Sequence, residues 1–128
     1  LYPMLIRAKG DRLVLITDCT RAGGMPDGEY TLGGQPIFVK GIECRLADGT
    51  IAGSVLRLNE AVRNLQRHGR IPMYQAVRCA SLNAAESVGA GERKGSLIPG
   101  KDADIALMDA DCQVWRTFVR GVCKFSRM

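Results

Sequence analysis

This sequence has a single histidine, few aromatic residues and no long apolar run. Its single histidine, His68, excludes a zinc site built from several histidines of this chain. No apolar run approaches the ~20 residues that are needed to span a bilayer. Aromatic residues make up only 5% of the chain, and its lysines and arginines are spread from end to end. The formal charge of +5 therefore predicts a solvated surface and no nucleic-acid partner.

The cysteine pattern and the first residues bear on where in the cell the protein is expected. Five cysteines form no C-x-x-C pair, and this odd, scattered set predicts reduced thiols in a cytoplasmic protein. The opening residues lack the charged start and long apolar segment of a signal peptide, so we expect no membrane partner. The 128 residues, 46% of them hydrophobic, suffice for one domain with a buried core.

The stretch around which the chain is organised is LVLITD, residues 13–18. Its unbroken apolar run, followed by Thr17, predicts a strand that is buried on both faces, as in a parallel sheet covered by helices. Asp18 comes directly after this strand, where the active sites of such sheets and barrels gather. On the residues alone, Asp18 has two interpretations: a cap of the following turn, or a functional carboxylate.

The elements after Asp18 predict a mixed α/β arrangement that ends in an all-β tail. We expect a β-hairpin with strands at residues 30–32 and 37–39 around a Gly33-Gly34 turn, and a third strand at 44–46. Apolar residues at helical spacing predict a helix that includes Val55 and ends at Gly69. Two further predicted helices follow, and three short strands are expected in the tail. The second helix starts at Pro72, a capping box of Asn83 and Glu86 starts the third, and the tail strands are residues 103–108, 113–119 and 122–125.

Several motifs together resemble the N-acetylglucosamine-6-phosphate deacetylase family. The most specific are LITD (15–18), GMPDGEYTLGG (24–34) and LADGTIAGS (46–54), in this order and spacing. EAVRNL (60–65) and ASLN (80–83) continue the match. GSLIPGKDADI (95–105) is similar to a closing motif that is shared across the amidohydrolase superfamily. The resemblance covers nearly the whole chain.

The resemblance implies an α/β fold: the C-terminal part of a metal-dependent (β/α)8 barrel hydrolase, plus the C-terminal strands of its small β-sandwich domain. Residues 1–94 would form the last strand, the hairpin insertion and the final helices of the barrel, and residues 95–128 the sandwich strands. The chain would be the last third of a longer enzyme whose main metal ligands lie upstream of Leu1. We expect it to form a homo-oligomer or to associate with the missing N-terminal part.

The resemblance also implies roles for individual residues. Asp18 matches the family's catalytic aspartate, next to a divalent metal ion such as zinc, and it is the one residue here that could touch the metal. It would take a proton from the attacking water and return it to the departing amine. Ile51, Ala52 and Gly53 match a loop that contacts the amino sugar, where Gly53 permits close approach. A plain turn into the next helix remains an alternative for these three residues.

The implied function is deacetylation of N-acetylglucosamine 6-phosphate, a phosphorylated amino sugar, to glucosamine 6-phosphate and acetate, with the isolated chain inactive. One alternative is another amidohydrolase, dihydroorotase-like or deaminase-like, and the segment DGTIAGS weighs against it. A second alternative is a non-catalytic structural or assembly module, which stays open because this chain carries no set of metal ligands. Arg21 and Cys19 lie where the family varies, so no role is assigned to them.

Overall fold

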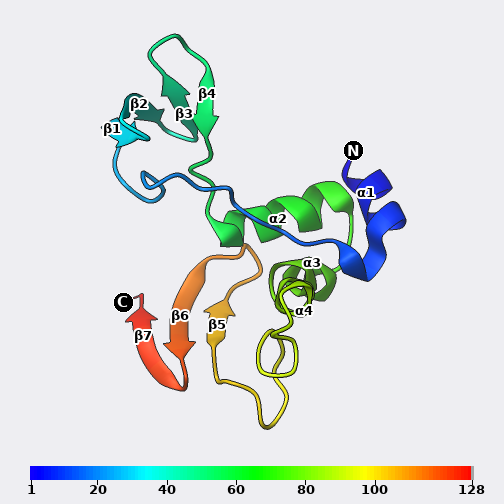
Figure 1. Ribbon diagram of the computed structural model, residues 1–128. Coiled ribbons are helices and arrows are strands. Elements are labelled where there is room, and N and C mark those ends of the chain that lie inside the picture. The colour runs from blue at the N-terminus through cyan, green and yellow to red at the C-terminus, as the bar shows by residue number, and fades with distance from the viewer. Residues whose placement is uncertain (128) are drawn as a thin grey trace. The chain divides into compact units, whose positions relative to one another are not determined.

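The computed structural model describes residues 1–127, and the chain divides into two compact units. One unit consists of Leu1–Leu15 together with Asn59–Met128, and the other consists of Ile16–Leu58. Figure 1 shows the elements in chain order. Within residues 1–127, no helix combines the length and the apolar character that are needed to cross a membrane.

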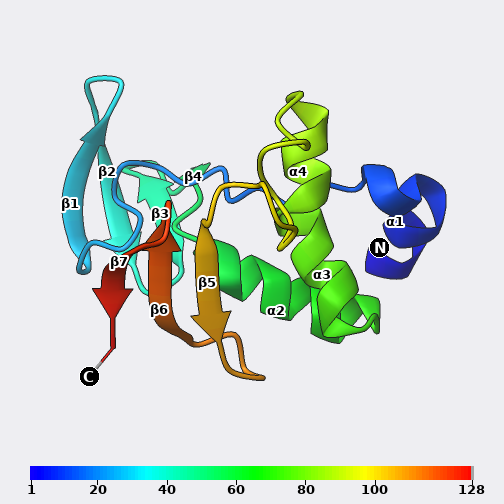
Figure 2. The same ribbon diagram turned by 90° about the horizontal axis from the view of Figure 1, so that it is seen from below.

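The Ile16–Leu58 unit contains a four-stranded antiparallel sheet in the order β1-β2-β3-β4 (Figure 2). Gly33 and Gly34 join the first two strands with φ values of 58° and 83°, as a two-residue hairpin turn requires. The predicted hairpin and third strand are therefore confirmed. The strands are β1 (Gly28–Leu32), β2 (Gln35–Lys40), β3 (Glu43–Leu46) and β4 (Ile51–Gly53).

Alternation along β2 builds the core of this unit. Ile37 and Val39 are buried, whereas Phe38 between them is 42% exposed, because successive side chains of a strand point to opposite faces. Ala22, from the loop before β1, and Cys44 of β3 complete the buried cluster. Ala22 shows that this loop is part of the core and does not run free over the surface.

The other unit contains the helices. Helix α2 (Leu58–Gly69) buries Ala61, Val62 and Leu65 on one face, and the predicted helix is confirmed there. Val55 lies before this helix and packs in the core of the other unit. Pro72 is the N-cap of α3, as expected for the residue that starts it. The remaining helices are α1 (Tyr2–Lys9), the 3-10 helix η1 (Gly10–Arg12), α3 (Met73–Ala80) and α4 (Leu82–Ser87).

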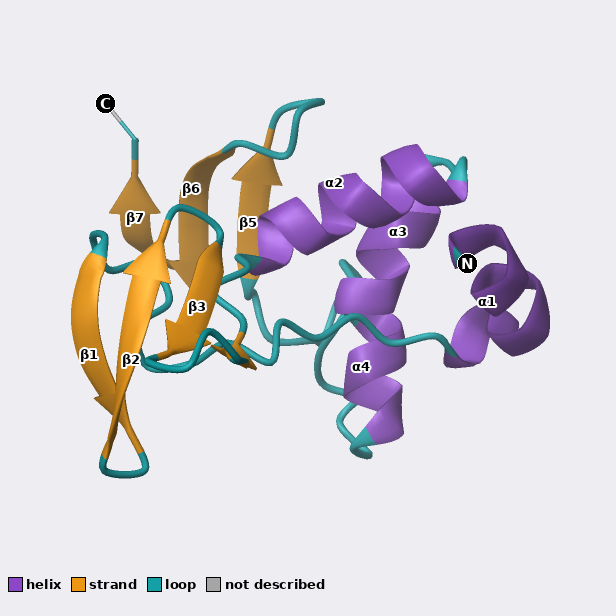
Figure 3. Ribbon diagram, turned by 90° about the horizontal axis from the view of Figure 1, so that it is seen from above, coloured by secondary structure: helices purple, strands orange, loops and turns teal. Residues whose placement is uncertain are grey.

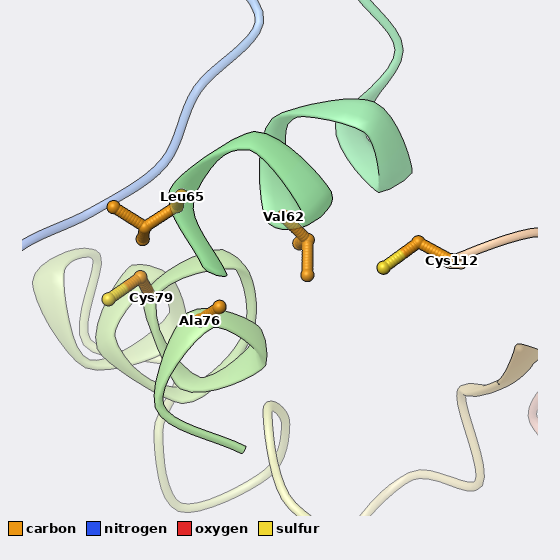
Figure 4. Close-up of a cluster of buried hydrophobic side chains, with 5 residues drawn as sticks. All are labelled: Val62, Leu65, Ala76, Cys79 and Cys112. Carbon is orange, nitrogen blue, oxygen red and sulfur yellow. The ribbon is translucent and has the colours of Figure 1, made fainter. Parts of the chain in front are cut away.

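A second hydrophobic core holds this unit together (Figure 4). Val62 and Leu65 of α2 meet Ala76 and Cys79 of α3, and Cys112 reaches the same cluster from the loop after β5. Burial raises the pKa of the Cys79 and Cys112 thiols, so both behave as small apolar side chains here. Half-buried residues from the beginning of the chain, among them Ile6, Leu13 and Leu15, pack against this cluster.

The tail forms a separate antiparallel sheet in the order β5-β6-β7 (Figure 3). Strands β5 (Ile105–Met108), β6 (Val114–Val119) and β7 (Val122–Ser126) confirm the predicted meander. All of β7 is exposed, so its apolar residues have no cover within the described chain.

The prediction of a paired strand at residues 13–17 is wrong for this structure. The segment is extended, with Leu13 at φ −74° and ψ 126°, but it belongs to neither sheet. The Leu15 N–H donates to the carbonyl of Cys79 at 2.9 Å, which is a bond to the end of a helix. A strand of a parallel sheet needs neighbouring strands on its edges, and residues 1–127 provide none at this segment.

The predicted capping box at Asn83 is also wrong. Ser81 is the N-cap of α4 and makes no side-chain capping bond, while Asn83 lies inside the helix and is only 3% exposed. The Asn83 side chain bonds instead to the carbonyl of Leu13. The side-chain amide that the local pattern predicts as a helix cap thus bonds to a residue that is distant in the sequence.

The boundaries between the two compact units also do not fall near residue 94. The tail strands share one unit with the helices, and residues 16–58 stand as a unit of their own. The assignment of residues 1–94 to a barrel and 95–128 to a sandwich concerns a larger fold, and it stays a prediction.

Candidate functional site

Asp18 lies at the end of the extended segment, in an unusual backbone conformation. Its φ is 47°, in the left-handed region that aspartate tolerates better than most residues. The residue is exposed. Its carbonyl accepts a hydrogen bond from the Ser54 N–H at 3.3 Å. Asp18 is therefore held by its backbone while its carboxylate remains open to water.

Ser54 joins the Asp18 segment to the end of β4. The Thr20 N–H donates to the Ser54 carbonyl at 2.8 Å, and Cys19 pairs with Ser54 in a parallel bridge. The chain at Asp18–Thr20 thus runs alongside the residue that follows Gly53. The structure brings together the predicted catalytic residue and the predicted substrate-binding segment, which are more than 30 positions apart in the printed sequence.

Gly53 is required by close packing. Its φ is 140°, and a Cβ at this position would lie 2.6 Å from Cγ2 of Thr20. Any larger residue would push the Asp18–Thr20 segment away from β4. In the structure, the group that lies close to this glycine is the chain's own Thr20, and the close approach of a sugar to Gly53 stays a prediction.

Ile51 and Ala52 form the rest of β4, so the segment is a short strand and not a plain turn. Gly53 pairs with Cys44 and Ile51 with Arg45, with an irregular register between the two pairs. Ile51 is 70% exposed, whereas Ala52 is half-buried against the core of its unit. Of the two side chains, that of Ile51 is the one available to a ligand.

A tight turn fixes where β4 begins. The Thr50 N–H donates to the Asp48 carboxylate at 2.9 Å, and this bond lowers the pKa of Asp48. The Arg45 guanidinium donates to the carbonyl of Gly49 at 2.7 Å. The Leu46 N–H donates to the Thr50 carbonyl at 2.8 Å and closes the loop. Strand β4 therefore begins, at Ile51, directly after a turn that several hydrogen bonds hold in place.

The sequence interpretation missed Ser54 and Thr20 as parts of this arrangement. The Ser54 hydroxyl accepts from the Leu56 N–H at 2.9 Å, and the Thr20 hydroxyl oxygen accepts from Ala22 at 3.4 Å. Both hydroxyls thus stabilise the backbone around Asp18. Ser54 is the last residue of the motif LADGTIAGS, so the family resemblance could have pointed to it. No sequence pattern points to Thr20.

The residues that the structure describes do not complete a metal centre by themselves. Among residues 1–127, no three histidine, cysteine, aspartate or glutamate side chains come together to hold an ion. His68, at the end of α2, stacks on the Tyr2 ring with centroids 5.8 Å apart. Asp18 would contribute at most one carboxylate. The residues present therefore do not fit a metal site by themselves.

Comparison with known proteins defines the class. The model of the amidohydrolase family matches residues 3–124, and the chain belongs to this family. The N-acetylglucosamine-6-phosphate deacetylase of Bacillus subtilis is 43% identical over 119 residues, which are 92% of this chain and 30% of that protein. The N-acetylgalactosamine-6-phosphate deacetylase of Escherichia coli is 40% identical over 111 residues, covering 87% of this chain and 29% of that protein. The chain thus spans about 30% of the length of these relatives.

Solved structures agree with this assignment. N-acetylglucosamine-6-phosphate deacetylase from Pasteurella multocida matches with a TM-score of 0.89 and 28% identity, over 95% of this chain and 32% of that chain. A mutant of the Mycobacterium smegmatis deacetylase in complex with N-acetyl-D-glucosamine-6-phosphate matches with a TM-score of 0.86 and 32% identity, over 95% and 33%. The fold is that of part of an amidohydrolase barrel with its small β domain. The amidohydrolase family is in general metal-dependent.

Proposed function

We propose that this chain is the C-terminal part of a cytoplasmic, metal-dependent deacetylase that converts N-acetylglucosamine 6-phosphate to glucosamine 6-phosphate and acetate. The observation that carries the proposal is the hydrogen bond between Asp18 and Ser54, because it unites the two segments for which the family resemblance implies chemistry. The divalent metal, zinc or a similar ion, would be held mainly by residues outside this chain.

In this proposal Asp18 is the catalytic residue. An exposed carboxylate on a backbone held at both Asp18 and Thr20 can accept a proton from a water molecule and keep its position during the transfer. The same carboxylic acid would then protonate the nitrogen of the leaving amine, which is too basic to depart as an anion. Hydrolysis adds one water, breaks the amide C–N bond, and yields acetate and the amine.

The segment Ile51–Gly53 would line the site for the amino sugar. Its backbone is fixed by the turn before β4 and by Ser54 after it, so the peptide groups are already in place before a ligand arrives. The exposed Ile51 side chain would supply apolar contact. We propose this as binding of the substrate and assign no residue to its phosphate group.

A second substrate has a specific observation in its favour. A relative named N-acetylgalactosamine-6-phosphate deacetylase is almost as similar, at 40% identity, as the 43% of the Bacillus subtilis enzyme. The two sugars differ only in the configuration of one hydroxyl group. The chemistry at the acetamido group is the same for both, so Asp18 would serve either substrate.

The test uses the full-length protein that contains this chain, supplied with a divalent metal. Acetate release is measured with N-acetylglucosamine 6-phosphate, with its galacto epimer, and with N-acetylglucosamine that lacks the phosphate. We expect the gluco substrate to have the highest kcat/KM and the sugar without phosphate to be poor. The isolated chain, residues 1–128, should release no acetate above buffer, because one carboxylate does not complete a metal site.

Three outcomes would change the proposal. A higher kcat/KM for the galacto epimer would reassign the substrate within the same chemistry. Absence of acetate release from all three sugars would refute the deacetylase proposal and favour another amidohydrolase activity. Turnover by the isolated chain would show that the missing ligands are not needed.

We also propose that the full-length protein forms a homo-oligomer. Light scattering on the full-length protein tests this proposal.

A further inference from the structure

Asn83 is a buried polar residue whose bonds lead to the segment that ends at Asp18. It is only 3% exposed and lies in the first turn of α4. Its amide nitrogen Nδ2 donates to the carbonyl oxygen of Leu13 at 2.8 Å, across 70 positions of the chain. Buried amides are retained in proteins when their hydrogen bonds are satisfied, and this one is bonded at both ends.

Arg78 fixes which way the Asn83 amide points. The Arg78 Nε donates to the Asn83 Oδ1 at 3.0 Å. Because a guanidinium can only donate, the oxygen of the amide must face Arg78, and the NH₂ group must face Leu13. An aspartate at this position would keep the bond to Arg78 but would turn a carboxylate oxygen toward the Leu13 carbonyl, where no proton lies between them.

A second bond acts on the same edge of the extended segment. The Leu15 N–H donates to the carbonyl of Cys79, at the end of α3, at 2.9 Å. In an extended chain, the C=O of Leu13 and the N–H of Leu15 point to the same side. The end of α3 and the start of α4 therefore bind this edge as a neighbouring strand would, with Asn83 as the side-chain member of the pair.

The anchor lies close to Asp18 along the chain. Only Ile16 and Thr17 separate Leu15 from Asp18, and an extended segment has little slack over so few residues. Asp18 itself has a left-handed backbone conformation, which persists only where the surrounding chain holds it. A shift at Leu13 would therefore pass directly to the carboxylate.

We propose that Asn83 is a positioning residue: it holds the Leu13–Leu15 edge so that the chain delivers Asp18 to the reacting group. The role in catalysis rests on the proposed deacetylase function, whereas the role as an anchor of residues 13–20 does not. Asn83 touches no substrate in this account and acts only through the backbone of Leu13.

The test compares variants of the full-length protein. Asn83→Asp removes the donor to Leu13 with almost no change in volume. Asn64→Asp makes the same chemical change on α2, at a side chain without a hydrogen bond among residues 1–127. Val62→Ala weakens the core against which Leu13 packs but removes no hydrogen bond to Leu13, so it controls for lost stability. Kinetics of deacetylation and hydrogen exchange of the peptide covering residues 13–20 are measured for each.

We expect Asn83→Asp to lower kcat by roughly 10- to 100-fold with KM changed by less than about threefold, because misplacement of a catalytic group costs rate more than binding. Exchange in residues 13–20 should be faster in this variant than in either control. If Asn83→Asp does not fold, Asn83→Ser removes the same bond without a new charge and is judged by the same criteria.

Two results would overturn the proposal. Wild-type exchange at residues 13–20 in the Asn83 variants would show that the anchor does not hold this segment. If Val62→Ala loses as much kcat as Asn83→Asp, the effect of Asn83 on kcat is explained by lost stability alone. If the wild-type protein releases no acetate, the deacetylase function fails, and the exchange experiment still decides whether Asn83 is the anchor.

Discussion

The core of the Ile16–Leu58 unit is assembled from neighbours in the sequence, whereas the core of the other unit joins residues from both ends of the chain. Ile37 and Val39 pack against Cys44 and Ala22, all within the same short stretch. Val62 of α2 meets Cys112, and Ile6 packs against the same cluster. The short-range unit carries Asp18 and Ile51–Gly53, whereas the long-range unit carries Asn83, for which we propose an effect on the site through the backbone of Leu13. Truncations in the long-range core should therefore cost more stability than truncations in the short-range core.

The two sheets differ in a similar way. In β2 the buried and exposed residues alternate, because the unit itself covers one face of the sheet. In β7 every residue is exposed, although Val122 and Phe125 are as apolar as the residues of β2. Apolar alternation thus predicts a strand in both places, but it marks a covered face only where the same unit supplies the cover.

The largest effect on stability is expected from Leu65→Ala. Leu65 is fully buried between helices that are held by the rest of the core, so the cavity cannot collapse, and the variant should lose ~3–5 kcal/mol of unfolding free energy. Ile37→Ala, in the smaller core, should lose less, ~2–3 kcal/mol, because loops around it can relax.

Urea denaturation of the full-length protein measures both changes. Leu97→Ala is the matched control, since Leu97 is 78% exposed and its truncation should shift stability by no more than about 0.5 kcal/mol. An Ile37→Ala loss as large as that of Leu65→Ala would remove the contrast between the two cores.

A smaller loss is expected from Gly53→Ala, and it should appear in activity as well. The new Cβ would meet Cγ2 of Thr20 in a backbone conformation that favours glycine, at a cost of ~1–3 kcal/mol. Because Ser54 would move with it, the position of Asp18 should change and kcat should fall. Adding Thr20→Ser removes the clashing methyl group and should restore part of both losses. No restoration in the double variant would mean that the close contact is not the cause.

The smallest effect concerns acid stability of the tail. A hydrogen bond from the Lys94 ammonium holds the pKa of Asp102 and of Asp104 below the ordinary value of an aspartate, and the Arg120 N–H adds to the shift at Asp104. Carboxylates with lowered pKa stabilise the fold above their unfolded pKa, and this contribution disappears as the pH falls through the folded value.

Lys94→Met should therefore reduce the loss of stability that the wild-type protein shows on acidification below about pH 4. The difference should be slight and should shrink in 0.5 M salt, because exposed ion pairs are screened. Thermal melts at several pH values measure it. An unchanged acid profile in Lys94→Met would show that these pairs do not matter to the fold.

Local patterns predicted the elements that local forces determine. The Gly33-Gly34 turn, the amphipathic α2 and the three tail strands all follow from turn chemistry and periodicity, and all are present. Strand β4 was missed because three residues ending in glycine carry no periodicity. The segment at residues 13–17 was predicted as a paired strand, but pairing depends on neighbours that its own sequence does not contain.

The candidate site shows the same division. Asp18 could be proposed from its place after an apolar run, and Ile51, Ala52 and Gly53 from the family motif. That Ser54 joins them depends on a backbone bridge between distant positions, which no spacing in the sequence reveals. Asn83 was predicted as a cap because its local pattern fits one, and only the tertiary structure directs its side chain to Leu13.

The turnover of Asp18→Asn in the full-length protein tests whether the Asp18 carboxylate moves the proton. Asparagine keeps the shape of the side chain but cannot accept the proton, so kcat should fall by roughly a thousandfold, with metal content and KM near wild type. Glu29→Gln, at an exposed carboxylate of β1 in the same unit, should keep wild-type kcat. A kcat for Asp18→Asn close to that of Glu29→Gln would contradict the claim that Asp18 carries the chemistry.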